Sequence, residues 1–95
     1  MTQVTVGTSP VKISNAGNRD FINIYNNGGA TIFLCYDGTC DSAVDPTGAA
    51  LTVNNGWPIT SGAYFTISND GNRNVWNHEI WAVSGSAGQD VRLQG

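Results

Sequence analysis

Charged side chains are scarce in this sequence of 95 residues. They make up 12% of the chain, about half the share of roughly 25% in an average soluble domain. The basic residues are only Lys12, Arg19, Arg73 and Arg92, and they are scattered. This pattern excludes the basic stripe that nucleic-acid binding requires. The Asn, Thr, Ser and Gly that stand in place of charge favour a protein packed against neighbours or secreted into a harsh medium.

Long apolar runs and helical periodicity are also missing. No segment approaches the ~18 apolar residues of a membrane span, so no membrane contact is expected. Residues 1–7 lack the basic and apolar regions of a secretory signal, which predicts a protein made in a cytoplasm and not exported by the standard route. Apolar residues instead alternate with period two, and this alternation predicts an all-β fold.

Eight short segments carry this alternation, and Gly-containing turn pairs such as Asp37-Gly38 and Asn55-Gly56 separate them. The predicted strands are Thr2–Val6, Val11–Ile13, Phe21–Asn26, Ala30–Tyr36, Ala50–Val53, Ala63–Ser68, His78–Val83 and Gln89–Gln94. They predict one domain over residues 1–95, a small antiparallel β-sandwich or jelly roll. The one long connection, residues 37–49, contains Pro46 and Gly48 and is predicted to be an exposed loop at one end of the sandwich.

A seven-residue motif occurs twice in the chain. Ile13–Arg19 and Ile67–Arg73 differ only at the middle position, which is Ala16 in one copy and Asp70 in the other. Each copy follows one β-like run and precedes another, so the motif predicts a sheet protein with approximate internal symmetry. The alternative is that Asn-Gly turn pairs recur by chance in a chain rich in both residues.

The two cysteines lie close together in the sequence. A two-residue hairpin loop at Asp37-Gly38 would place Cys35 opposite Cys40, with Cα atoms roughly 4.5 Å apart. That separation allows a disulfide, although a cytoplasmic origin favours two reduced thiols instead. Two cysteines alone cannot complete a tetrahedral metal shell, so no metal site is expected there.

Titratable groups form no recognisable catalytic pattern. His78 is the only histidine, it shares strand parity with Ile80 and Ala82, and the sequence contains no nucleophile elbow. A half-buried structural role is therefore predicted for His78. Asp37, Asp41 and Asp45 recur every four residues, but their spacing is not that of a calcium loop, and a solvated acidic loop is expected. The sequence thus predicts a protein that is not an enzyme and has no cofactor.

Aromatic residues are the remaining candidates for binding. The tryptophans are Trp57, Trp76 and Trp81, and three tyrosines accompany them: Tyr25, Tyr36 and Tyr64. Exposed aromatic rings anchor protein interfaces or stack on sugar rings, whereas buried ones belong to the core. Trp57 precedes Pro58 in a segment that resembles a turn, and Trp81 lies on the strand face opposite Ile80. All three roles remain open for these residues at this stage.

Several segments together resemble small structural proteins of tailed bacteriophages and prophages. The segments are Val4–Val11, Phe21–Asn27, Ala30–Leu34, Val53–Ile59 with Ser61-Gly62, and Glu79–Ser84. They match a strand ending in Asn-Asn, a Thr-hydrophobic-Phe-hydrophobic strand, an Asn-Gly-x-Pro turn and a late hydrophobic-Trp-Ala strand. The segment Cys35–Asp45 departs from that pattern and is interpreted as a host- or partner-specific tip.

The resemblance implies a capsid decoration or cement protein, often trimeric. Such a protein would be made in the host cytoplasm and bind between subunits of the major capsid protein, on the capsid exterior of the virion. Residues 1–10 would then lie on a neighbour and extend its sheet. The residues expected at the interface are Val4, Val6, Trp57, Trp76 and Trp81. Two other hypotheses are a tail, neck or fibre component, and a carbohydrate-binding module.

Overall fold

The computed structural model describes residues 2–15, 21–36, 39–43, 45, 50–68 and 78–94. The strands in these residues are β1 (Thr2–Val6), β2 (Val11–Ser14), β3 (Phe21–Asn26), β4 (Ile32–Cys35), β5 (Trp57–Ile59), β6 (Tyr64–Ser68), β7 (Ile80–Ser84) and β8 (Gln89–Gln94). The predicted all-β fold is thereby confirmed. Across the described ranges, no helix is long and apolar enough to cross a membrane.

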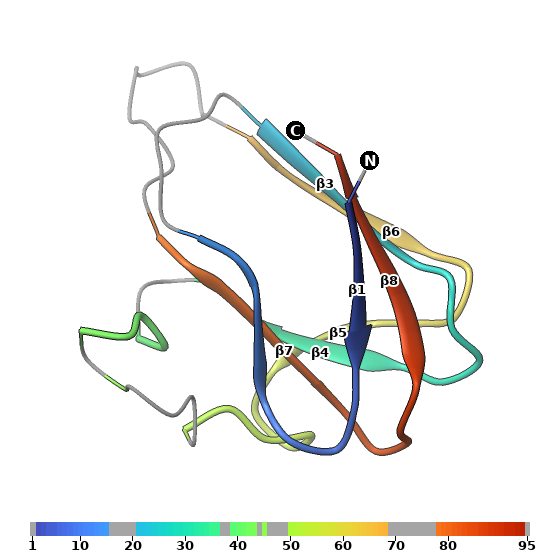
Figure 1. The fold of residues 1–95 in the computed structure, drawn as a ribbon, viewed down its shortest axis with the longest axis horizontal. Coiled ribbons are helices and arrows are strands. Elements are labelled where there is room, and N and C mark those ends of the chain that lie inside the picture. The colour runs from blue at the N-terminus through green and yellow to red at the C-terminus, as the bar shows by residue number, and fades with distance from the viewer. Residues whose placement is uncertain are drawn as a thin grey trace.

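The strands form two four-stranded antiparallel sheets (Figure 1). Sheet A has the order β1-β8-β3-β6, and sheet B has the order β2-β7-β4-β5. The ladders β1/β8, β2/β7, β3/β6 and β4/β5 are the successive rungs of one long hairpin, and the ladders β3/β8 and β4/β7 arise when that hairpin wraps on itself. This strand order is that of the jelly roll.

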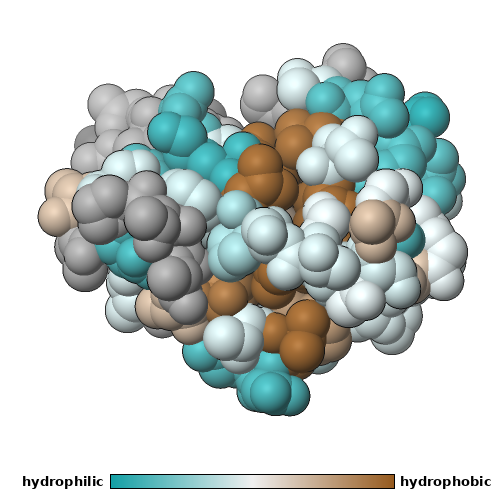
Figure 2. Space-filling view, turned by 60° about the horizontal axis from the view of Figure 1, so that its bottom comes forward, coloured by the Kyte–Doolittle hydropathy of each residue, from teal (hydrophilic) through white to brown (hydrophobic). Residues whose placement is uncertain are grey.

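The core lies between the two sheets because alternate residues of each strand point inward. Its members are aliphatic and almost fully buried: Val6, Ile13, Ile22, Ile24, Ile32, Leu34, Ile59, Ile67, Ile80, Ala82, Val91 and Leu93. Figure 2 shows hydrophobic residues along the middle of one face, between more polar flanks.

The strand order has the internal symmetry that the repeated motif predicts. Each strand can be replaced by the one four places later in the chain, with counting continued from β8 to β1. This replacement converts β1-β8-β3-β6 into β5-β4-β7-β2, which is the strand order of sheet B read from the opposite edge. The two motif copies begin at equivalent places, because Ser14 pairs with Ile80 and Ser68 pairs with Phe21. Each of these serines thus faces the first residue of the strand that follows the other copy. Residues 16–19 and 69–73 of the motif lie outside the described residues.

One predicted strand is wrong, and another was missed. Residues 50–53 form no strand, because Asn55 accepts a hydrogen bond from the Thr52 amide at 2.7 Å and donates one to the Ala50 carbonyl at 2.6 Å, closing a turn. The strand that was missed is β5, which pairs with β4 through Trp57 and Ile59. Its Pro58 is tolerated because β5 is an edge strand.

Two described residues of the long connection after β4 pack on the outer face of sheet B. Within it, Cys40 is 2% exposed and Leu51 is 3% exposed, and both pack on Trp81 and Val83 of β7. The prediction of an exposed loop at one end of the sandwich is therefore wrong for Cys40, whereas Thr39 and Ala43 of that loop are exposed. Residues 37, 38, 44 and 46–49 of the predicted loop lie outside the described part of the chain.

Candidate interaction surface

The two sheets differ in what covers their outer faces. On sheet B, Trp81 and Val83 are 8% and 3% exposed beneath the chain's own connecting segment. On sheet A, several outward residues are exposed, among them Tyr64 at 72% and Phe21 at 44%. Large aromatic side chains exposed on one face indicate an interaction surface. The outer face of sheet A is therefore the first candidate.

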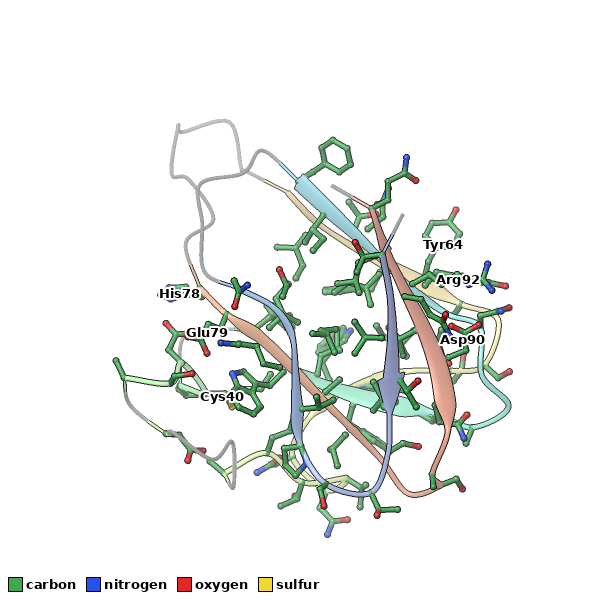
Figure 3. The ribbon with its side chains drawn as sticks, viewed as in Figure 1. Cys40, Tyr64, His78, Glu79, Asp90 and Arg92 are labelled. Atoms are coloured by element: carbon green, nitrogen blue, oxygen red, sulfur yellow. A yellow bond between two sulfur atoms is a disulfide. The ribbon has the colours of Figure 1, made fainter. Side chains whose placement is uncertain are left out.

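Neighbouring strands bring aromatic, amide and guanidinium groups together on this face. Tyr25 of β3 lies between Arg92 of β8 and Tyr64 of β6, and Asn23 pairs with Gln94 in the next row. These five side chains line a shallow hollow of about 200 Å³. Figure 3 shows Tyr64 and Arg92 close to each other on this side of the molecule. Tyrosine and arginine are the residue types that most often dominate binding energy at interfaces.

The guanidinium of this face is held by an acidic partner. Arg92 donates from Nη2 and Nε to Oδ2 of Asp90, at 3.1 and 3.3 Å. Asn27 donates to the same oxygen at 2.8 Å. The hydrogen bond from Asn27, and then those from Arg92, keep the pKa of Asp90 below its ordinary value although desolvation opposes them. The ion pair orients Arg92 and balances its charge, so the face stays close to neutral.

A second aromatic group lies where the edge strands β5 and β6 meet. The ring of Trp57 lies 5.9 Å from that of Phe65, and Tyr36 lies 5.4 Å from the same ring. Trp57 pairs with the inward-facing Leu34 and so points toward the gap between the sheets, yet it remains 52% exposed. Of the predicted interface residues described here, Trp57 is the most exposed.

A cavity of about 330 Å³ adjoins Trp57. Its walls come from the end of β4, the disulfide and the turn before β5, and they include Leu34, Tyr36 and Leu51. This volume is at the lower end of the range of about 300–1,000 Å³ found for small-molecule pockets. The described lining residues supply no carboxylate, imidazole or amine, and their polar side chains include those of Tyr36, Thr39 and Asn55.

Of the two alternatives left open for the cysteines, the disulfide is present, but the facing-pair geometry proposed for it is wrong. Cys35 and Cys40 are bonded, and their Cα atoms are 6.1 Å apart instead of the expected 4.5 Å of a facing pair. The reason is that β4 pairs with β5 and β7, and Cys35 itself pairs with Trp81. Cys40 lies in a turn and not on a facing strand. The bond therefore ties β4 to the segment that covers sheet B.

The other predicted interface residues have different surroundings. Val6 is 0% exposed and Trp81 is 8% exposed, so both side chains hold the fold together and offer little surface to a partner. Val4 is half-buried and packs at the margin of the core. Trp76 lies outside the described residues. Trp57 and Val4 are thus the predicted residues that the structure leaves accessible.

The single histidine belongs to a hydrogen-bond network beside β7. His78 is exposed rather than half-buried, and its Nδ1 lies 3.0 Å from Oδ2 of Asp41. The other oxygen of Asp41 accepts the Glu79 amide at 2.9 Å. Figure 3 shows His78 and Glu79 on the side of the molecule away from Tyr64 and Arg92. No group of side chains with the composition of a metal site occurs in the described ranges.

Glu79 connects this network to the covering segment. Its Oε1 accepts hydrogen bonds from Nε1 of Trp81 at 2.9 Å and from the hydroxyl of Ser42 at 2.7 Å. The bond from Trp81, followed by that from Ser42, lowers the pKa of Glu79 from its ordinary value. Every described contact of this carboxylate is structural, so the network fastens residues 41–42 onto sheet B.

No protein-family model, curated protein or solved structure matches this chain. The function of the chain is therefore inferred from the two surfaces described above.

Proposed function

We propose that this chain is a non-enzymatic structural protein of a virion that decorates or cements the head shell. It binds between subunits of the major capsid protein on the capsid exterior. The observation that carries the proposal is the contrast between the sheets: the chain itself covers Trp81 and Val83 on sheet B, whereas sheet A presents Tyr64 and Arg92 to solvent beside the half-buried Tyr25. A jelly roll with one partly covered sheet and one solvent-exposed sheet is suited to binding a capsid surface through the exposed sheet.

The chemistry of the chain supports this assignment. A low charge content of 12% reduces repulsion between copies packed side by side. The tyrosines and the oriented Arg92 supply anchors of the kind that carry binding energy. Several linked copies that occupy several capsid subunits at once multiply a modest single-site affinity. The mechanical result is a bridge across subunit junctions that resists internal pressure.

Binding to empty shells that lack this protein tests the proposal. We expect the purified chain to bind such shells, and the double substitution Tyr64→Ala with Arg92→Ala to weaken binding by at least tenfold. The exposed Asn54 lies in the turn before β5, so Asn54→Ala is the matched control and should bind like the wild type. Absence of wild-type binding contradicts the proposal.

Copy number separates shell decoration from the tail, neck or fibre alternative. Quantitative mass spectrometry of purified particles should give on the order of hundreds of copies for a protein that follows the shell lattice. A handful of copies per particle would instead assign the chain to the neck or tail.

The hollow on sheet A favours one second candidate, a carbohydrate-binding module. Aromatic rings at Tyr25 and Tyr64 beside the amides of Asn23 and Gln94 suit a neutral sugar ring, which needs an apolar face and hydrogen-bonding groups. A glycan-binding screen with Tyr64→Ala as the negative control tests this candidate. Saturable binding that this substitution abolishes would favour the module over the shell protein.

A further inference from the structure

The four edge strands of the sandwich are protected to very different degrees. Natural proteins guard exposed edges with lysine, proline, bulges or very short strands, since an unguarded edge pairs with other chains. In sheet B, β2 carries Lys12 and a shift of register between Lys12 and Ser14. The other edge, β5, is three residues long and contains Pro58. Both edges of sheet B therefore resist the addition of another strand.

Both edges of sheet A lack these features. β1 (TQVTV) and β6 (YFTIS) are five residues long and contain neither charge nor proline. Each follows its one neighbour in unbroken register, β1 against β8 and β6 against β3. Each therefore presents a straight row of backbone donors and acceptors to the outside. The open face of sheet A thus continues to two open edges.

The strand directions allow these two edges to meet. Successive strands of sheet A are antiparallel, so β1 and β6 run in opposite directions. A second copy laid beside the first in the same orientation brings its β1 alongside β6 as an antiparallel neighbour. This head-to-tail contact uses both unprotected edges, whereas a twofold contact between two β1 strands leaves both β6 edges bare.

The side chains at the two edges also complement each other. The ring of Phe65 on β6 packs against that of the half-exposed Trp57 on β5. A strand added about 4.8 Å from β6 brings its inward residues to that aromatic pair. In β1 the inward apolar residue that remains accessible is Val4, which is half-buried, and the exposed Thr2 lies on the same face. The contact therefore buries apolar surface on both partners as well as pairing backbone groups.

We propose that copies of this chain associate head to tail, with β1 of one copy pairing antiparallel with β6 of the next to extend sheet A. The pairing supplies the contact between neighbouring copies, and its setting on a shell rests on the proposed function. The association itself is a property of the purified chain. If the purified chain does not associate, the result of the shell-binding experiment still stands. If the chain does not bind shells, the result on self-association likewise still stands.

The register of β6 provides a selective test. The Asn26 amide donates to the Ala63 carbonyl at 3.0 Å, and hydrogen-bonded pairs alternate along an antiparallel ladder. The Thr66 amide therefore points away from β3, toward the free edge. Thr66→Pro removes that donor without breaking the β3/β6 ladder. Thr66→Ala is the matched control, because both substitutions lose the hydroxyl that donates to Asn23.

Light scattering after size exclusion reads the result. We expect the wild type and Thr66→Ala to have a mass of several 10.0 kDa chains, and Thr66→Pro to have the mass of one folded chain. A circular dichroism spectrum of wild-type shape shows that the proline variant is folded. A monomeric wild type, or a folded Thr66→Pro variant that still associates, overturns the proposal.

Engineered disulfides identify which edges meet. Gln3 and Thr5 on β1 and Thr66 on β6 have exposed side chains. Combining Thr66→Cys with Gln3→Cys or with Thr5→Cys should give a ladder of covalent oligomers in one of the two pairings, whereas each single substitution stays uncrosslinked. Covalent dimers from Thr5→Cys or Gln3→Cys alone show a β1-to-β1 contact and reject the head-to-tail arrangement.

Discussion

The buried amide of Asn26 should be among the most costly side chains to remove. It is 0% exposed, and its Nδ2 donates to the carbonyls of Ala30 at 2.8 Å and Ile59 at 2.9 Å. Its Oδ1 accepts the Gly28 amide at 3.0 Å. One side chain at the end of β3 thus fixes the turn into β4 and joins sheet A to β5 of sheet B. Asn26→Ala removes all three bonds together.

The cost follows from the groups left unpaired. A buried backbone group without a partner costs about 1–3 kcal/mol. The Ile59 bond is buried, while the bonds to Ala30 and Gly28 are partly buried and accessible to water. The sum is therefore about 3 kcal/mol, a large part of the roughly 5–15 kcal/mol that stabilises a domain. In a domain of this size it lowers the Tm by roughly 12–24 °C.

Urea and thermal unfolding followed by tryptophan fluorescence measure this loss. Asn54→Ala, which changes an exposed turn residue, is the control and should shift the free energy of unfolding by less than about 0.5 kcal/mol. If Asn26→Ala also loses less than about 1 kcal/mol, the reasoning is refuted, since the three bonds would then contribute little to holding the sheets together.

Three further changes test the covering segment and its attachment. Hydrogen bonds lower the folded-state pKa of Glu79 from its ordinary 4.5, so its contribution to stability is complete above that value and is lost as the pH falls through the folded pKa. Glu79→Gln should therefore reduce the pH dependence of the urea midpoint across this acid range. An unchanged pH profile would contradict the hydrogen-bond network. Reduction of Cys35–Cys40 should lower the free energy of unfolding by about 2 kcal/mol, as expected for so short a loop, and equal urea midpoints with and without reductant would argue against a stabilising bond. Gly56→Ala places a methyl group 2.6 Å from a neighbouring side chain and should cost about 1–3 kcal/mol in thermal unfolding, whereas Gly85→Ala, with nothing within 4 Å, should have little effect; equal melting temperatures would contradict the close approach.

The sequence predicted which face of a strand a side chain occupies better than it predicted which strands lie side by side. Alternation correctly placed Ile22 and Ile24 on one face of β3 and left Tyr25 on the other. That Tyr25 lies beside Arg92 depends on the ladder between β3 and β8, strands far apart in the chain. The sequence therefore offered Tyr25 and Tyr64 as candidates but did not predict that Arg92, Asn23 and Gln94 lie beside them.

The prediction for Trp81 shows a second reason for failure. Its side of β7 was identified correctly, but its environment depends on Cys40 and Leu51, which lie in no strand and have no periodic pattern. Asn26 was missed for a similar reason, since an Asn-Asn-Gly sequence is typical of an exposed turn. Its burial follows from the approach of β5, a strand that Pro58 concealed.

The first ladder of the jelly roll determines how the protein responds to force. Thr2 pairs with Leu93, so both ends of the chain leave the molecule at the same place, as Figure 1 shows. A tension that pulls the two ends apart loads the hydrogen bonds between β1 and β8 one after another, because those bonds lie perpendicular to the strands. The ladder then peels open at low force. A force applied at the edges of a sheet, in its plane and perpendicular to the strands, is instead shared by all the hydrogen bonds of a ladder at once. The molecule therefore resists force better when it is attached through its faces and edges than through its two ends.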